Sequence, residues 1–271
     1  VVNVTYGADA QKATITYIDD DETNSNGKQG KVINVQNLSG HTAETISTNV
    51  QTAIDNYKKA GYVLDSNDAP DQLTFDNDDH ATQAFTVHLG HGHITVTPDQ
   101  PKEPGDNIPD TNKRFPKGVD HDSLNKTVTR TINVTDPNDN KSQKVDQITF
   151  TRTADVDEVT GDVHYSDWTN GNNGDTGKFD EAVITSFYGY TPHANYLGKN
   201  SKGQYVINEI SVSHKSNNIE INVTYTADPQ VANLNFVDDE GHVDLASWDT
   251  QFGFSNAPIN FSHAEEILKE H

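Results

Sequence analysis

The 271 residues include neither cysteine nor methionine. The absence of cysteine excludes disulfide bonds and thiolate metal sites. A chain without either sulfur residue resists oxidation, which suits an exposed setting outside the cell. No apolar run approaches the roughly 18 residues of a membrane-spanning helix, and no signal peptide is recognisable. We therefore expect no membrane insertion of these residues.

Positive charge and apolar side chains are also scarce. The sequence has 19 Lys and Arg against 41 Asp and Glu, which gives a net charge of −22. A polyanion repels nucleic acid backbones and anionic lipids, so neither is an expected partner. Only 32% of the residues are hydrophobic and the mean hydropathy is −0.76, which predicts thin cores with much exposed surface. The length suggests about two domains.

Catalytic sequence motifs are absent as well. The sequence contains no G-x-S-x-G, H-E-x-x-H, phosphate-binding loop or dinucleotide-binding fingerprint. With 41 carboxylates, coincidence explains a neighbouring pair better than glycosidase chemistry does. We expect that the protein is not an enzyme and requires no cofactor.

One segment occurs twice. Residues 3–20 read NVTYGADAQKATITYIDD, and residues 222–239 read NVTYTADPQVANLNFVDD. The offset is constant at 219 positions (222 − 3), and ten of the eighteen aligned residues are identical. A repeat that starts again near the end indicates a piece of a tandem array. Such arrays favour reach and multivalent binding by monomeric modules.

The first module is predicted to be a small α+β domain over residues 13–96, after an end of a preceding repeat at 1–12. Alternating strands surround one helix, whose apolar stripe is Ile46, Val50, Ile54 and Tyr57. Thr45 or Ser47 would cap its start, and Gly61 would end it. The order β-β-α-β-β predicts a β-grasp (ubiquitin-like) plan with one solvated sheet face.

The rest of the chain is predicted to be mostly β. Five prolines in residues 97–118 predict an extended, semi-rigid connector, with packing against the neighbouring modules as an open alternative. Residues 119–228 alternate like strands throughout, with Ile219, Ile221, Val223 and Tyr225 on an inward face. Residues 229–271 match the start of the first module and form only part of the next one. The predicted fold class is α+β, mostly β, in elongated tandem modules.

Several sequence segments together resemble the mucus-binding protein repeats of lactobacilli, which are mucin-binding adhesins. The resemblance covers essentially the whole chain and rests on Ala13–Glu22, Phe75–Asp79, Leu124–Ile132, Phe150–Thr169 and Tyr188–Pro192. It implies a β-grasp mucin-binding domain followed by a second β-rich domain, on a Gram-positive, cell-wall-anchored surface protein. It also implies adhesion to mucin, and some members of the family bind immunoglobulin.

Aromatic residues flank a loop rich in glycine and asparagine at residues 168–178. Aromatic faces stack on sugar rings, and asparagine side chains bond sugar hydroxyls. The alternative is that these are ordinary core aromatics. The candidate glycan-binding residues are Tyr165, Trp168, Asn170, Asn172, Asn173, Tyr188 and Tyr190.

Two groups of residues are candidates for metal binding. His88, His91 and His93 form an H-x-x-H-x-H pattern that could hold a transition metal, but Gly90 and Gly92 weaken a rigid geometry and a solvated strand end is the favoured explanation. Acidic turns offer hard oxygen ligands for Ca²⁺, although turn chemistry alone explains them and none has EF-hand spacing. The candidate Ca²⁺ ligands are Asp19, Asp20, Asp76, Asp78, Asp136 and Asp139.

The sequence therefore predicts an extracellular adhesin repeat that binds mucin glycans by weak, lectin-like, multivalent contacts. An immunoglobulin- or protein-binding module and a passive stalk spacer are the alternatives. Twelve histidines on a chain of net charge −22 also predict tighter mucin binding at mildly acidic pH.

Overall fold

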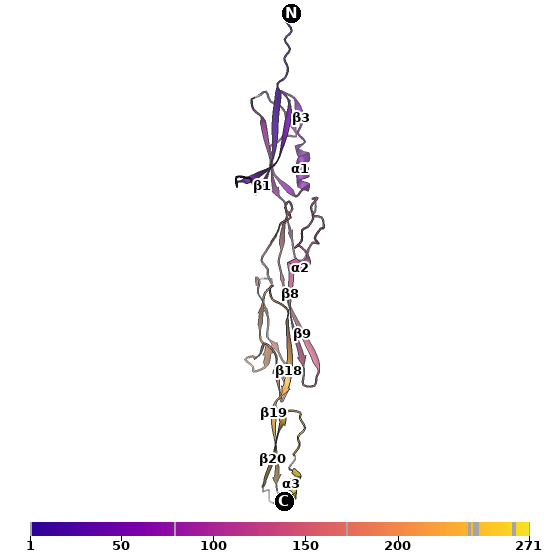
Figure 1. Cartoon of the computed structure of the whole chain (residues 1–271), viewed down its shortest axis with the longest axis vertical. Coiled ribbons are helices and arrows are strands. Elements are labelled where there is room, and N and C mark those ends of the chain that lie inside the picture. Colours follow the sequence, from indigo (N-terminus) through magenta and orange to yellow (C-terminus); the bar gives the residue numbers. More distant parts are fainter. Residues whose placement is uncertain are drawn as a thin grey trace. The chain divides into compact units, whose positions relative to one another are not determined.

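The computed structural model (Figure 1) describes residues 2–78, 80–171, 173–237, 240, 244–261 and 264–270. The chain forms two compact units. The first unit comprises Val1–Lys126 and Thr151–Trp168, and the second comprises Thr127–Phe150 and Thr169–His271. Both consist mainly of strands, in agreement with the predicted class. None of the helices in the described part of the chain has the length and apolarity to span a membrane.

The first unit begins with a four-stranded sheet of order β2-β1-β6-β4. Its central strands β1 and β6 are parallel, and the outer pairs are antiparallel. Figure 1 shows helix α1 alongside this sheet. The elements are β1 Ala10–Thr23, β2 Gln29–His41, α1 Val50–Lys59, β4 Tyr62–Asn67 and β6 Gln83–His91.

The alternation along β1 produces the core of this sheet. Ile15 and Tyr17 are fully buried, and they pack with Val50 and Ile54 of α1. Val32 of β2 and Val63 of β4 remain about half exposed. One helix therefore covers one face of the sheet, as the single predicted helix requires.

The helix begins later than the apolar stripe predicted. Ile46 lies in strand β3 Thr45–Ser47, where it pairs with Leu73 of β5 Gln72–Thr74. Asn49 adopts a left-handed conformation, with φ of 55°, and separates the strand from the helix. The predicted caps are also wrong. The Val50 N–H donates to Thr48 Oγ1 at 3.3 Å, and not to Thr45 or Ser47.

The proline-rich segment 97–118 is folded, which corrects the prediction of an extended run. Ile108 and Phe115 are 2% and 4% exposed and form a core with Val96 and Leu124. Backbone bonds such as Gly105 N–H to Phe115 O, at 2.9 Å, fold the segment back on itself. The elements around it are β7 His93–Val96, α2 His121–Leu124, β10 Ala154–Asp157 and β11 Val163–Tyr165.

The second unit contains a four-stranded sheet of order β14-β18-β8-β9. Ile221 and Val223 of β18 are buried, as predicted, and Ile132 of the parallel neighbour β8 packs at the same level. The sheet strands are β8 Asn125–Thr135, β9 Lys141–Thr151, β14 Tyr190–His193 and β18 Ile219–Ala227. Shorter strands are β12 Gly177–Phe179, β13 Ala182–Val183, β15 Leu197–Lys199, β16 Tyr205–Ile207 and β17 Ile210–Val212.

Residues 229–271, called the tail below, form a hairpin and a short helix. Strand β19 Pro229–Val237 pairs with β20 Asp244–Phe254, and α3 Ala264–Glu270 follows. The repeated residues Asp238 and Asp239 lie outside the described residues. The strand that the repeat predicts is therefore present over Pro229–Val237.

Candidate functional site

Tyr165 and Trp168 come together in the first unit, around an arginine that the sequence did not single out. The Arg152 Cζ atom lies 3.6 Å from the centroid of the Tyr165 ring and 4.5 Å from that of Trp168. Strand pairing sets this arrangement, because Tyr165 of β11 lies opposite Ala154 of β10, two residues after Arg152. A guanidinium group over aromatic rings is a favourable cation–π contact.

Further bonds hold this cluster in place. Arg152 Nε donates to Ser123 O at 2.9 Å, and the Tyr165 hydroxyl donates to Gly118 O at 3.0 Å. Gly118 has a φ of 94°, and a Cβ atom there would collide with the Tyr165 hydroxyl. Tyr165 nevertheless stays 40% exposed. Tyr165 is therefore not fully enclosed by the core, and Trp168 is half-buried.

Arg152 differs from the other buried or half-buried arginine of the chain. Arg130, 2% exposed, makes two bonds to Asp146 Oδ2, at 3.2 and 2.7 Å. No carboxylate of the described residues lies within ion-pair distance of Arg152. Its guanidinium group instead lies over the Tyr165 and Trp168 rings and donates from Nε to the Ser123 carbonyl oxygen.

Asn170 and Asn173 belong to the second unit and line a shallow cleft of about 540 Å³. The loop is closed by bonds from Asn170 N–H to Gly174 O and from Asn173 N–H to Asn170 O. Thr176, Lys178 and Ser211 add hydroxyl and ammonium groups to the same cleft. The predicted residue Asn172 lies outside the described residues.

Tyr188 lies in the turn that precedes β14 and Tyr190 is the first residue of β14, and neither is among the described residues that line this cleft. The Tyr188 side chain is fully exposed. The Tyr190 hydroxyl accepts a bond from Asn256 Nδ2 at 3.1 Å. The six described candidates therefore belong to three local groups: the pair Tyr165 and Trp168, the loop of Asn170 and Asn173, and Tyr188 and Tyr190 at the start of β14.

The acidic turns use their oxygens within the protein. Asp136 accepts bonds from the backbone of Asn138 and Asn140, and Asp76 accepts one from Asp78 N–H. Asp139 has a φ of 65° at the tip of its turn. The described residues contain no group of three or more His, Asp or Glu side chains arranged to hold a metal ion. Ca²⁺ binding at Asp19, Asp20, Asp76, Asp78, Asp136 or Asp139 stays a prediction.

Each histidine of the H-x-x-H-x-H pattern pairs with carboxylates. His88 Nδ1 lies 3.0 Å from Asp20, and His93 Nδ1 lies 2.7 Å from Asp155. His91 is buried and makes two such contacts, with its Nδ1 2.6 Å from Asp157 and its Nε2 3.1 Å from Asp19.

The surroundings of His91 shift several pKa values. Burial lowers the pKa of His91, but the bonds to Asp157 and Asp19 outweigh burial and raise it above 6.5. Burial raises the pKa of Asp157, but backbone bonds from Thr160 and the contact with His91 lower it below 3.8. Burial and the neighbouring Asp19 raise the pKa of Tyr62 to about 12.

Comparisons with known proteins agree with the resemblance. Residues 11–91 match the family described as mucin binding domain, and residues 119–229 match the family described as Muc B2-like domain. The crystal structure of Mub-RV is 29% identical, with a TM-score of 0.57, over 80% of this chain and 99% of its own. None of the curated proteins compared with the chain matches it.

Two further solved structures are similar at lower TM-scores. The type 2 repeat of the mucus binding protein MUB from Lactobacillus reuteri is 26% identical, over 80% of this chain and all of its own, with a TM-score of 0.44. The mucin-binding domain of Spr1345 from Streptococcus pneumoniae is 27% identical, over 38% of this chain and 91% of its own, with a TM-score of 0.29.

Proposed function

Because this chain is a mucus-binding protein repeat, we propose that it binds the glycans of mucin as a lectin-like part of a bacterial surface adhesin. It acts outside the cell, on a Gram-positive, cell-wall-anchored protein. The binding is weak at each repeat and gains strength from repetition, because linked sites raise one another's effective concentration. The proposal assigns the chain no catalytic role and no required cofactor.

The observation that carries the glycan proposal is the cluster of Arg152, Tyr165 and Trp168. Sugar rings stack on aromatic faces, and guanidinium N–H groups bond sugar oxygens. The cluster is half exposed and held by bonds to Ser123 and Gly118. A site that is already ordered loses little conformational entropy when it binds a ligand.

The cleft of Asn170 and Asn173 supports a second, separate sugar contact in the other unit. Its amide, hydroxyl and ammonium groups are the types that bond sugar hydroxyls. The Lys178 ammonium group in this cleft already forms an ion pair with Glu209 at 2.7 Å. We therefore expect the cleft to bond sugar hydroxyls and not to attract anions.

We also assign residues 10–91 to the β-grasp class. The support is the order β2-β1-β6-β4, the parallel central pair, and α1 packed on one face. The Pro-rich segment does not belong to this sheet, since its apolar residues pack in a separate cluster.

The test is binding of the whole chain to immobilised mucin, before and after enzymatic removal of sialic acid and O-glycans. We expect binding to fall when the glycans are removed. Binding that survives their removal would contradict the lectin proposal and indicate a protein contact, such as one with immunoglobulin-like partners. Absence of binding to intact mucin would make the chain a spacer.

Variants then locate the contact. Trp168→Ala and Arg152→Ala should each weaken mucin binding about tenfold or more, because each removes a group that faces the sugar. Tyr6→Ala is the matched control, since Tyr6 is 93% exposed and outside the cluster. Circular dichroism must show that each variant stays folded. Unchanged binding by folded Trp168→Ala would exclude the aromatic cluster.

A further inference from the structure

The first module begins and ends on neighbouring strands of its sheet. Strand β1 is the first strand of this module and β6 is the last, and the two are parallel at the centre of the sheet β2-β1-β6-β4. Their register runs without a shift over seven residue pairs, from Ala13 opposite Gln83 to Asp19 opposite Leu89. The chain therefore enters and leaves this module through two strands that are hydrogen-bonded to each other.

The four-stranded sheet of the second unit has the same arrangement. Within this sheet β8 comes first along the chain and β18 comes last, and they are again parallel neighbours at the centre, in the order β14-β18-β8-β9. Their register runs from Ile219 opposite Arg130 to Val223 opposite Val134. Two sheets with different strand orders thus share one feature, which is that the entry strand and the exit strand form a parallel central pair.

This arrangement determines how tension along the chain acts on the inter-strand bonds. A pull on the residues before β1 draws that strand toward its start, and a pull on the residues after β6 draws that strand toward its end. Because the two strands are parallel, these opposite pulls slide one strand along the other. The evenly spaced bonds of the parallel pair then share the load, and they must break together before the strands can separate.

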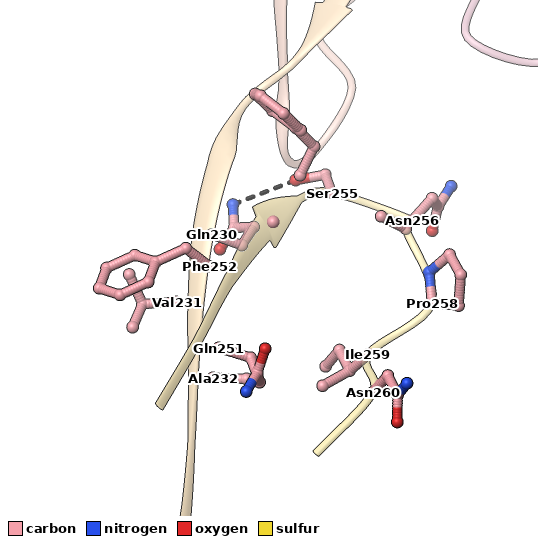
Figure 2. A pocket seen from close by; sticks show the side chains of 13 residues that line it. Gln230, Val231, Ala232, Gln251, Phe252, Ser255, Asn256, Pro258, Ile259 and Asn260 are labelled. Carbon is pink, nitrogen blue, oxygen red and sulfur yellow. Dashed lines mark hydrogen bonds between the residues drawn. The ribbon is translucent and has the colours of Figure 1, made fainter. Parts of the chain in front are cut away.

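The antiparallel hairpins of the chain have the opposite geometry. In the hairpin of β19 and β20, Figure 2 shows Gln230 and Ser255 at the same end, where the Gln230 side chain donates to the Ser255 hydroxyl at 3.0 Å. Tension applied to two such neighbouring ends peels the strands apart, so that one residue pair at a time bears the whole load. Strands β1 and β2 of the first module pair in the same way, with Lys12 opposite Ser39.

Side chains reinforce the parallel pair of the first module. His88 Nδ1 of β6 lies 3.0 Å from Asp20 of β1, and His91 Nε2 of β6 lies 3.1 Å from Asp19 of β1. Water is excluded where the pair packs on α1, because four apolar side chains of the two strands are fully buried there: Ile15, Tyr17, Val87 and Leu89. Exclusion of water matters because water competes for each backbone bond that is stretched.

The parallel pair of the second unit is reinforced by side-chain amides. Asn133 Nδ2 of β8 donates to Glu220 Oε1 at 2.9 Å and to Asn222 Oδ1 at 3.1 Å, and both acceptors belong to β18. The Thr129 N–H donates to Asn218 Oδ1 at 2.9 Å, just before β18 begins. The apolar side chains of this pair are also buried, through Val128, Ile132, Ile221 and Val223. These bonds add to the backbone bonds that oppose sliding.

We propose that the two parallel pairs, β1 with β6 and β8 with β18, are mechanical clamps that let the chain carry tension without unfolding. The load rests on the proposed function, since a surface adhesin is under tension when flow pulls on its bound ligand. The clamps themselves follow from strand order and register. Forced unfolding is governed by the unfolding rate and not by the free energy of unfolding. Thin cores are therefore compatible with high resistance to force.

The first test is single-molecule force spectroscopy of the whole chain, held by peptide tags fused to its two ends. We expect two high-force unfolding events, one for each parallel pair. In the comparison, the load acts between the N-terminal tag and the thiol of Ser39→Cys, an exposed position of β2 opposite Lys12. This pull peels β2 from β1, so its first event should need a severalfold lower force. Equal forces in the two directions would overturn the proposal.

Introduced disulfides assign each event to its strand pair. The chain has no cysteine, so two introduced thiols can pair only with each other. Thr16→Cys with Thr86→Cys joins opposed residues of β1 and β6, and Thr131→Cys with Glu220→Cys joins opposed residues of β8 and β18. Neighbouring strands have the Cα spacing that a disulfide requires.

Each oxidised variant should lose one of the two events, and the event of the first module should release about 25 nm of chain. The reduced form of the same variant is the matched control and should show both events. An event that persists after thiol titration has shown complete oxidation would exclude the clamp at that pair.

These experiments contain no mucin, so their outcome is independent of whether the chain binds it. A chain that binds mucin but unfolds at low force from its ends would retain the proposed function and lose the clamps. A chain that resists force but does not bind mucin would retain the clamps and lose the proposed function.

Discussion

His91 bonds to two carboxylates through both nitrogens of its ring. A neutral imidazole donates from one nitrogen only, so two carboxylate acceptors require the protonated ring. The side chain is 5% exposed, and its backbone N–H donates to Asp21 at 2.6 Å. The Tyr62 hydroxyl, which donates to Asp19 at 3.2 Å, completes the polar surroundings. The bridge links strands β6, β1 and β10 within the first unit.

This bridge predicts a pH-dependent stability. The pKa of His91 is raised above 6.5, so its contribution is complete below about pH 6.5 and is lost as the pH rises through the folded pKa. The pKa of Asp157 is lowered below 3.8, so its contribution is lost only as the pH falls through that lower value. The bridge should therefore stabilise most between about pH 4 and 6.5.

The measurement is thermal unfolding of the chain and of His91→Asn from pH 5 to pH 9. We expect the variant to be less stable by about 3 kcal/mol at pH 5, because it leaves buried carboxylates without a cation. The difference should shrink at alkaline pH. His93→Asn is the control, since His93 pairs with Asp155 while about half exposed. A difference that stays constant or grows with pH would contradict the bridge.

Sequence patterns could not identify the two carboxylates that bond to His91. They lie 72 and 66 residues away along the chain. The H-x-x-H-x-H pattern draws attention to the right residues, but it contains no information about which carboxylates the fold places beside them. For the same reason the sequence did not place Arg152 beside Tyr165 and Trp168.

At the scale of elements, the segment 97–118 shows that a high proline content does not by itself make a segment extended. Prolines predict an extended chain, yet a few apolar residues between them are enough to anchor it. Phe115 is the largest of these, and its backbone is bonded to Gly105 and Asp106.

Phe115→Ala distinguishes a folded segment from a spacer. We expect a loss of about 3–5 kcal/mol of unfolding free energy in the first unit, because the ring is nearly fully buried. Urea denaturation followed by circular dichroism measures it. Val145→Ala, at a position 51% exposed, should cost under about 0.5 kcal/mol. An equally small cost at Phe115 would mean that the segment is an extended connector after all.

At the scale of the whole molecule, we expect the net charge to control how tightly the chain binds mucin. Mucin glycans carry sialate and sulfate, so a chain of net charge −22 is repelled at neutral pH. Protonation of histidines and some carboxylates at pH 5 reduces the repulsion.

We therefore expect severalfold tighter mucin binding at pH 5 than at pH 7.4 in low salt, measured by surface plasmon resonance. The difference should narrow at about 0.5 M salt, because screening shortens the reach of surface charges. Circular dichroism at both values must show the same fold. Equal or weaker binding at pH 5 would rule out net repulsion as the controlling factor.

The sequence by itself determined the mostly-β class, the repeat and the buried faces of long strands. Strand alternation and a constant repeat offset are local, periodic signals, and they place Ile221 and Val223 on the buried face of β18 correctly. The same signals predicted the strand that residues 229–237 form.

Only the tertiary structure decided which distant side chains meet. It moved Ile46 from the predicted helix into β3, because pairing with Leu73 outweighs a helical stripe. It brought Arg152 to Trp168, and His91 to Asp157. Contacts between elements depend on register and topology, which no short sequence pattern encodes.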